Sequence, residues 1–587
     1  MPFSISPGVN VSEIDLTTVV PGVATTEGAI AGVFRWGPTN ERILVSNEVE
    51  LANTFGKPTN DNYETFFTAA NFLGYSDALY VTRVTANAAV ADANGAFEAA
   101  YEGELGNSLA VAYVTSASEF NGAASTYTID INASSASGTV SGSDDDLNEI
   151  EVGDVLVVNN QELRIASIGS IANNAGTYSA TVAFNTKYIA VENAANTSFD
   201  VKWGWSSFFE TAPGTNELHI VVYDEGGEFT GEAGTILETY SNLSTVAGTK
   251  FFDGTTAYVN DALEQRSSYI RRTVAALATK GYESFTGGDD GATESTIPVG
   301  TLAAGYDLYQ TAEEVDVSLI LQGPPRADAF ANYLIDNIAE KRRDCVVFIT
   351  PNVTPGSYTA QNLVTAVSGL STSSYAVVDS GFKYQYDKYN DVYRWVPLNG
   401  DVAGLCARTD DNRDPWYSPA GYNRGFIKNV VKLSLNPTKA ERDLIYKNGI
   451  NPVISQAGQG ALLFGDKTFL NQPSAFDRIN VRRLFIVLEK AIAISARRSL
   501  FEFNDDFTRA QFRNLVEPFL RDVQGRRGIT DFRVVCDGTN NTPEVIDRND
   551  FIGDIYIKPA RSINFIQLNF VAVRTGVEFS EIVGQAT

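Results

Sequence analysis

Hydrophobic residues near the start of the chain follow a strand period in some segments and a helical period in one. Between Ala29 and Val84, short apolar runs flank Tyr63–Leu73, where Phe66, Ala70 and Leu73 recur three or four positions apart. That spacing places apolar side chains on one face of a helix. The segment is therefore predicted to form half of a mixed α/β domain.

A regular alternation of strands and helices is predicted later in the chain. Strand Val315–Leu321, a helix from Ala327 to Ile338, strand Cys345–Thr350, a second helix and strand Tyr375–Val378 follow one another. This order implies parallel strands joined by right-handed crossovers, a fold that often binds nucleotides at its strand ends.

The loop after the first of these strands argues against a nucleotide site. It contains Pro324 and Pro325, which lack the backbone N–H groups that a phosphate cradle needs, and no glycine-rich phosphate-binding spacing follows. Phe55–Thr59 resembles a phosphate loop, but no glycine stands five residues before Gly56, so a turn is predicted there.

Other segments predict further elements. Residues 86–203 are rich in Ala, Ser, Thr, Asn and Gly and contain alternating runs at Tyr127–Ile131 and Val155–Val158, which predict an inserted, acidic, all-β domain. Thr438 with Glu441 forms a capping box.

A longer helix is predicted over Val481–Ser499. The whole pattern indicates a multidomain α+β or α/β protein whose conserved mixed α/β body is built from N- and C-terminal parts. The predicted divisions are a 1–20 arm, 21–85 first part of the body, 86–203 inserted outer domain, 204–365 second inserted α/β domain, 366–500 remainder of the body, and 501–587 C-terminal domain with an arm strand.

Both ends of the sequence have the pattern of extended strands. Apolar residues alternate with polar ones and are too few to form a core of their own. The residues concerned are Val9, Val11, Ile14 and Leu16 at the N-terminal end and Ile566, Leu568 and Phe570 at the C-terminal end.

Charge excludes some partners. The 587 residues have a formal net charge of -27, which repels a phosphate backbone, so direct nucleic-acid binding is not expected. Residues 1–300 hold 12 Lys and Arg against 38 Asp and Glu, whereas residues 407–533 hold 21 against 14. The acidic region is either an ordinary solvated surface, with the basic region forming internal salt bridges, or, in a self-assembling protein, the two are complementary contacts.

Candidate chemistry is sparse. The three cysteines, Cys345, Cys406 and Cys536, are far apart and fit buried thiols in a reducing compartment, and the one histidine, His219, lies in an apolar strand pattern. The acidic clusters at 144–151 and 289–290 lack calcium-loop spacing. No catalytic residue, metal or cofactor is therefore expected, and no signal peptide or membrane-spanning stretch is recognised.

Several short blocks together resemble the tail sheath family of contractile-tailed phages and related injection machines. The ordered blocks are Ser6–Val9 followed by Glu13, Phe55-Gly56, Leu79–Val84, Gly287–Gly291, Asp414–Gly421 leading to Arg424-Gly425, Asn448–Asn451, Gly465–Thr468, Ile479–Leu484 and Phe503–Asp506. Asn10, where an aromatic is common, and Phe469, where leucine is usual, depart from the family pattern.

This resemblance implies a structural subunit that polymerises into a helical sleeve and contracts, rather than an enzyme. It implies that the subunit binds other copies of itself in stacked hexameric rings, and that it also binds the tail tube, baseplate and tail terminator proteins. It further implies assembly in the host cytoplasm and a final location in the virion tail. Terminal arms would add strands to sheets of neighbouring subunits, whereas the sequence pattern alone favours pairing within one subunit, as is usual for terminal strands.

The resemblance also suggests a role for the basic region near the C-terminal end. Arg482, Arg483, Arg497 and Arg498 are expected on an inner surface that meets the tube or a neighbour. The alternatives are the sheath of a bacterial injection system or tailocin, a glycan-binding surface adhesin, and a tail-associated hydrolase in which carboxylates act as acid and base.

Overall fold

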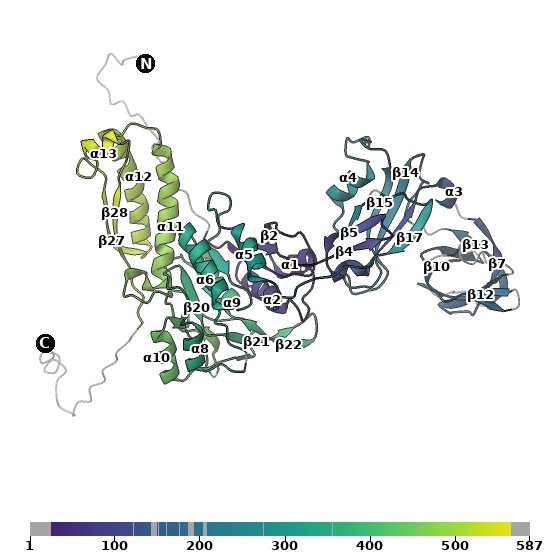
Figure 1. Cartoon of the computed structure of the whole chain (residues 1–587), viewed down its shortest axis with the longest axis horizontal. Coiled ribbons are helices and arrows are strands. Elements are labelled where there is room, and N and C mark those ends of the chain that lie inside the picture. The colour runs from purple at the N-terminus through teal and green to yellow at the C-terminus, as the bar shows by residue number, and fades with distance from the viewer. Residues whose placement is uncertain are drawn as a thin grey trace, which may run out of the picture.

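Three parts follow one another along the long axis of the molecule (Figure 1). A helical C-terminal domain lies at one end, a mixed α/β body in the middle, and a β-rich outer part at the other end. The computed structural model describes residues 25–564 except 121–122, 143–149, 151, 160, 175–176, 186–192, 203–207, 274, 355 and 457.

The body is built on one largely parallel sheet that joins distant parts of the chain. Its order is β2-β3-β1-β18-β19-β20-β24, with β2 antiparallel to β3 and the other neighbours parallel. The bounds are β1 Gly28–Gly32, β2 Ile43–Val45, β3 Leu79–Arg83, β18 Leu319–Leu321, β19 Val346–Ile349, β20 Ala376–Asp379 and β24 Ile450–Asn451. The parallel arrangement predicted for residues 315–379 is confirmed.

Helices cover this sheet because their apolar faces match its buried strands. The helix predicted at Tyr63–Leu73 forms with those bounds as α2, and Phe66, Ala70 and Leu73 are all buried. The other helices of the body are α1 Glu48–Phe55, α5 Val299–Asp307, α6 Asp328–Tyr333 continued by the π-helical η4 Leu334–Ala339 and by α7 Glu340–Arg342, α8 Ala360–Ala366, α9 Asn399–Asn412 and α10 Lys439–Lys447.

Small sheets complete the body. β21 Phe382–Asp387 pairs with β22 Val392–Pro397 and β23 Lys432–Leu433, and β25 Val453–Gln456 pairs with β26 Gly460–Leu463. The predicted capping box is confirmed at the start of α10, where the Thr438 hydroxyl accepts from the N3 backbone and Glu441 accepts from the Thr438 backbone at 2.8 Å.

The outer part begins and ends beside the body. Its two sheets have the orders β15-β14-β6-β17 and β16-β5-β4. The elements are β4 Val90–Ala93, β5 Phe97–Glu102, η1 Glu104–Ser108, β6 Leu109–Val114, α3 Ala117–Phe120, β14 Glu217–Asp224, β15 Thr235–Ser244, α4 Val259–Arg266, β16 Ile270–Arg272 and β17 Lys280–Ser284.

This pairing corrects the predicted division at residues 203 and 204. Strand β6 comes from before that boundary and pairs with β14 from after it, so both belong to one folded unit. Strands β18 and β19, placed in a second inserted domain, lie instead in the central sheet. The error arose because strand partners distant in sequence leave no local pattern.

A further β domain is nested within the outer part. Its sheet has the order β10-β9-β13-β7-β8-β12-β11 and contains the runs predicted at residues 127–131 and 155–158. The bounds are β7 Ala123–Ile131, β8 Ser137–Gly142, β9 Val155–Val158, β10 Gln161–Ile168, β11 Ala172–Asn174, β12 Thr177–Phe184 and β13 Ala194–Lys202. Its core includes buried Ile129, Leu156 and Phe199.

In the described part of the C-terminal domain, two long helices pack against a two-stranded sheet. Its elements are η5 Ala475–Asp477, α11 Ile479–Ala496, η6 Arg497–Ser499, α12 Asp506–Gly525, β27 Ile529–Val535, α13 Pro543–Asp547 and β28 Asp554–Pro559. The helix predicted at 481–499 is thereby confirmed. Asp505 caps α12 by accepting from the Thr508 N–H at 2.8 Å, and Leu484, Leu488, Phe512 and Val516 are buried between the elements.

Candidate functional site

The strand ends of the central sheet, where many α/β proteins bind ligands, are filled by side chains of this chain. The Asn399 amide donates to the Gly323 carbonyl at 2.9 Å and to the Thr350 hydroxyl at 3.0 Å, and that hydroxyl donates to Asp379 at 2.7 Å. Gln322 accepts from the Thr350 N–H at 3.0 Å. Burial raises the pKa of Asp379 to about 8. This polar network connects the strand ends to α9.

A buried ion pair lies beside this network. Lys383 donates to Asp401 at 2.9 Å and to the Lys428 carbonyl at 3.0 Å, and the side chains of both ion-pair partners are fully buried. The Tyr75 hydroxyl donates to the same carboxylate at 3.1 Å. Burial lowers the pKa of Lys383, with Asp401 opposing that shift. The pair ties β21 to α9 and α2, which is a structural role.

The histidine and the cysteines, which could have taken part in catalysis or metal binding, are all buried within the chain. His219 is buried in β14, where Nε2 bonds to the Thr211 carbonyl at 2.8 Å and Nδ1 accepts from the Asn242 N–H at 3.0 Å, as predicted for a strand histidine. Cys345, Cys406 and Cys536 are free and buried. Within the described ranges no cluster of three or more His, Cys, Asp or Glu is placed to hold a metal ion.

Two of the four predicted contact arginines are inside the molecule, which corrects their assignment. Arg483 is 3% exposed and pairs with Asp410 at 2.7 Å, and it also donates to the Thr25 carbonyl at 3.2 Å. Arg482 is 6% exposed, with its guanidinium 4.2 Å from the ring centre of Tyr375. Both join α11 to the body, because each finds partners far away in the sequence.

Arg497 and Arg498 are exposed, at the turn that follows α11. Large apolar side chains project into solvent beside them: Leu500 is 63% exposed, Phe501 106% and Phe503 86%. This surface, here called the distal patch and defined by these five residues, lies at the connection between α11 and α12. Large apolar side chains exposed next to one another in this way are uncommon on the surface of a monomeric protein.

The predicted arm residues lie outside the described residues: Val9, Val11, Ile14, Leu16, Ile566, Leu568 and Phe570. The nearest described feature that could receive such strands is the sheet of β27 and β28, which has two strands among the described residues. Its Phe532, Val534, Ile555 and Ile557 pack on the core of the C-terminal domain. Both outer edges of this hairpin are therefore candidates for further strands.

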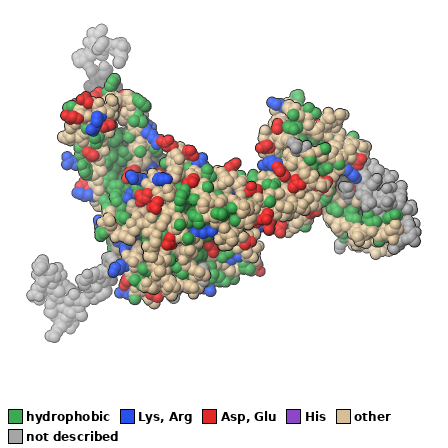
Figure 2. All heavy atoms as spheres, viewed as in Figure 1, with side chains coloured by type: hydrophobic (Ala, Val, Ile, Leu, Met, Phe, Trp, Pro, Cys, Tyr) green, Lys and Arg blue, Asp and Glu red, His purple; other side chains and the backbone are tan. Residues whose placement is uncertain are grey.

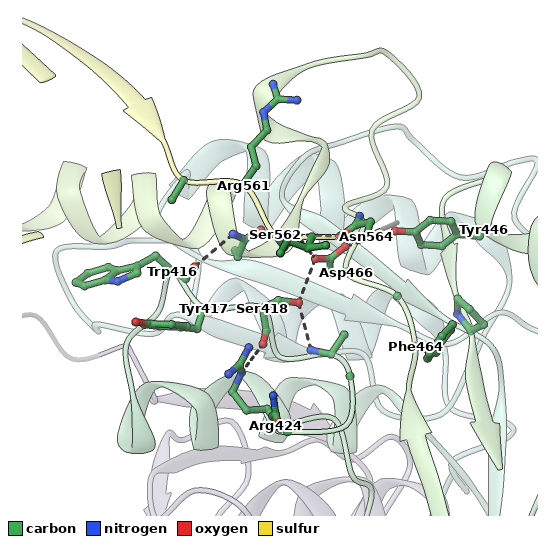
Figure 3. Close-up of a pocket in the computed structure, with 18 of the residues that line it drawn as sticks. Trp416, Tyr417, Ser418, Arg424, Tyr446, Phe464, Asp466, Arg561, Ser562 and Asn564 are labelled. Atoms are coloured by element: carbon green, nitrogen blue, oxygen red, sulfur yellow. Dashed lines mark hydrogen bonds between the residues drawn. The ribbon is translucent and has the colours of Figure 1, made fainter. Parts of the chain in front are cut away.

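A groove of about 810 Å³ opens where the C-terminal domain meets the body (Figure 3). Trp416 and Tyr417 lie on one side of it and Phe464 and Tyr446 on the other. Asp466 accepts from Ser418 at 3.0 Å and from Ser562 at 2.9 Å, and it pairs with Arg478 at 3.0 Å. The last described residues, Arg561 to Asn564, form part of the wall.

Two of the blocks that resemble the tail sheath family contribute to this groove, although their sequence alone predicts no site. Trp416, Tyr417, Ser418, Ala420 and Gly421 of the first block line one wall, and Gly465 and Asp466 of the second line another. Their aromatic and charged composition was the available signal. Their proximity depends on packing between segments about fifty residues apart and could not be read from local pattern.

Comparison with known proteins gives three family matches along the chain. Residues 28–84 match the tail sheath protein Gp18 domain III N-terminal region, residues 319–469 the phage tail sheath protein central domain, and residues 471–572 the phage tail sheath C-terminal domain. These segments correspond to the body and the C-terminal domain, and the outer part lies between the first two.

Two relatives that match nearly the whole chain are also tail sheath proteins. The tail sheath protein of Vibrio phage KVP40 is 34% identical over 99% of this chain and 100% of its own, and that of Enterobacteria phage T4 is 34% identical over 99% of both. The sheath tail protein from Listeria innocua shares the fold, with a TM-score of 0.51 at 11% identity over 91% of this chain and 92% of its own.

The family matches and the full-length relatives define the class of this protein, a structural subunit of a phage tail. The chain belongs to the tail sheath protein family of bacteriophages. It is a virion tail component that polymerises into a helical sheath.

Proposed function

We propose that this subunit acts without catalysis, by forming a sleeve around a tail tube in which terminal arms of one copy add strands to the β27–β28 hairpin of the next. The observation that supports this is the hairpin itself, which has two strands among the described residues, in a chain whose terminal segments have strand patterns. The outer edge of each strand offers backbone N–H and C=O groups with which an added strand can pair.

The energies are sufficient to keep neighbours linked. An added strand of about six residues forms about as many backbone hydrogen bonds, each contributing roughly 1 kcal/mol net. One arm therefore contributes several kcal/mol, repeated at every subunit. Such links allow copies to move as rigid bodies during contraction while remaining connected.

The arms can be tested by deletion and by substitution. Removal of residues 1–20 is expected to leave a folded subunit that forms no sleeves in electron micrographs. Val9→Asp with Val11→Asp should have the same effect, because charges would replace the apolar face of the strand. Asn10→Asp with Ser12→Asp, on the opposite face, is the matched control. Normal sleeves from the truncated protein would contradict arm exchange.

The distal patch is the proposed contact with the tail tube. Its two arginines can steer a charged partner, and its three exposed apolar side chains would form the centre that such a contact buries. Arg497→Glu with Arg498→Glu should weaken copolymerisation with purified tube, and added salt should weaken the wild-type contact. Lys447→Glu, on exposed α10, serves as the charge control. Unchanged, salt-independent copolymerisation of the double variant would contradict this assignment.

A further inference from the structure

The groove between the body and the C-terminal domain has a basic rim. Arg424, Lys439, Arg442, Arg527 and Arg561 line it, against Asp443 and Asp466. Among the described residues none of these five cations forms an ion pair with a carboxylate, and Asp466 is already engaged by Arg478. In a chain of net charge -27, such a locally positive hollow attracts an acidic group.

The inside of the groove offers apolar contact as well. Phe464 is 42% exposed and Ile563 83% exposed, although both belong to the lining. The Arg442 guanidinium lies 5.5 Å from the ring centre of Phe464, and that of Arg424 lies 5.4 Å from the ring centre of Tyr417. An occupant with apolar side chains flanked by carboxylates would therefore match the groove.

The C-terminal part of the sequence has that composition. Residues 577–587 read Val-Glu-Phe-Ser-Glu-Ile-Val-Gly-Gln-Ala-Thr, with Glu578 and Glu581 beside Phe579 and Ile582 and without a basic residue. The carboxylates suit the basic rim, and the phenylalanine and isoleucine suit the exposed aromatic and aliphatic lining.

The position of the groove favours the tail of another copy. Arg527 precedes β27 and Ala560 follows β28, so the open end of the hairpin borders the groove. A strand that another copy adds to the hairpin runs along it. Residues 566 to 572 span about 20 Å when extended, roughly the length of β27, so an arm strand that runs antiparallel to β27 ends beside the groove and brings the following residues to it.

We propose that residues 577–587 of a second copy dock in this groove of the subunit whose hairpin receives the C-terminal arm. The contact would anchor the arm at its far end, so that the strand cannot slip along the hairpin. This inference rests on the proposed exchange of arms, but its site and its ligand are separate from the hairpin.

Peptide binding tests the site independently of sleeve formation. A fluorescent peptide of residues 576–587 is titrated into the subunit truncated after Gly576, and anisotropy is recorded at low and high salt. Saturable, salt-sensitive binding is expected. Lys439→Glu with Arg442→Glu should weaken it at least tenfold, whereas Lys447→Glu, on the same helix but outside the groove, should not.

Two controls address folding and sequence specificity. Arg561→Glu, on an exposed segment, should weaken binding even if the double variant on α10 proves unstable. A peptide with Glu578→Lys and Glu581→Lys should bind at least tenfold more weakly. Absence of binding, equal binding of the reversed peptide, or preferential binding of a peptide of residues 1–20 would overturn the proposal.

Crosslinking identifies the copy that supplies the tail. In the full chain with Arg442→Cys and Glu581→Cys, oxidised sleeves should yield covalent chains of subunits. A crosslink confined to single subunits, or its absence in well-formed sleeves, would overturn docking between copies and leave arm exchange standing. If sleeves still form normally after deletion of residues 1–20 or 566–570, arm exchange is contradicted, whatever the result with the peptide.

Discussion

Arg83 shows how one residue joins two parts of the molecule. It is fully buried at the end of β3 and donates to the Phe34 carbonyl at 2.9 Å, the Gly37 carbonyl at 2.9 Å and the Glu102 carbonyl at 2.7 Å. Glu102 ends β5, so this guanidinium connects the body to the outer part. Burial lowers the pKa of Arg83 to about 10.

Arg83→Lys should therefore be costly although the charge is kept. A lysine ammonium cannot reach three carbonyls that a planar guanidinium contacts together, and at least one buried acceptor would lose its partner. The expected loss is about 2–4 kcal/mol in the free energy of unfolding, measured with denaturant. Arg521→Lys, on the exposed side of α12, should change nothing; equal stability of the two variants would contradict this role.

Glu64 provides a pH-dependent term in stability. It adjoins Glu294, which is buried and accepts from the Thr65 N–H at 2.9 Å. Burial and then the charge of Glu294 raise the pKa of Glu64 to about 8 from its usual 4.5. The folded protein keeps a proton that the unfolded chain releases, so this contribution is present below pH 4.5 and is lost as pH rises to 8.

The substitution Glu64→Gln removes the carboxyl group that holds this proton in the folded protein. The free energy of unfolding of the variant should fall less than that of the wild type between pH 5 and pH 8, with a difference on the order of a few kcal/mol at pH 8. Differential scanning calorimetry at several pH values measures this. Glu41→Gln, at an exposed position, should follow the wild-type curve, and parallel curves for both variants would rule out the assignment.

At the scale of elements, α2 and α9 approach closely because glycine stands at the contact. A Cβ at Gly400 would lie 2.3 Å from the Thr68 carbonyl oxygen, and one at Gly404 would lie 2.4 Å from the ring of Tyr75. The Thr68 carbonyl cannot move without shifting α2, and the ring of Tyr75 lies directly after the end of that helix. The absence of a Cβ at these two glycines therefore sets the distance between α2 and α9, and α9 in turn holds the polar network at the strand ends.

Gly400→Ala should destabilise the body by about 1–3 kcal/mol despite the better helix propensity of alanine. Gly300→Ala is the matched control, because no atom lies within 4 Å of a Cβ there, and it should stabilise α5 by up to about 1 kcal/mol. Denaturant unfolding of both variants measures the contrast. A stabilised Gly400→Ala protein would show that the helices can separate without cost.

Local pattern was a good guide to elements and a poor one to their partners. The period of Phe66, Ala70 and Leu73 gave the bounds of α2, and the capping box located the start of α10. The charge of Arg483 could not reveal that Asp410, from another helix, neutralises it inside the molecule. The groove likewise depends on contacts between distant segments.

At the scale of the whole molecule, acidic and basic side chains are unevenly distributed along the long axis. Figure 2 shows acidic side chains gathered on the outer part near its junction with the body, whereas lysine and arginine side chains lie mainly on the body and the C-terminal domain. None of the described helices is long and apolar enough to cross a membrane. The surfaces assigned to assembly all lie away from the outer part.

The outer part should accordingly be dispensable for polymerisation. The Ala292 N–H donates to the Ala86 carbonyl at 2.9 Å, so the two connections to the body are adjacent, and the main core of the body includes no residue between them. Replacing residues 87–291 by a short Gly-Ser linker, with Trp36→Ser to remove an uncovered aromatic, should yield a folded protein that still forms sleeves in electron micrographs. Loss of sleeves from a folded product would contradict this division of labour.

The strand order of the central sheet also determines how early the body can fold during translation. Strands β1 and β3 end by Arg83, yet their partner β18 begins at Leu319. Ribosomes add roughly 5–20 residues per second, so the first strands wait on the order of ten seconds or more before their neighbour leaves the exit tunnel. The outer part can fold in that interval, since its strands pair among themselves. The body of a nascent chain is therefore not folded until translation is nearly over. Polymerisation with other copies is delayed until that point.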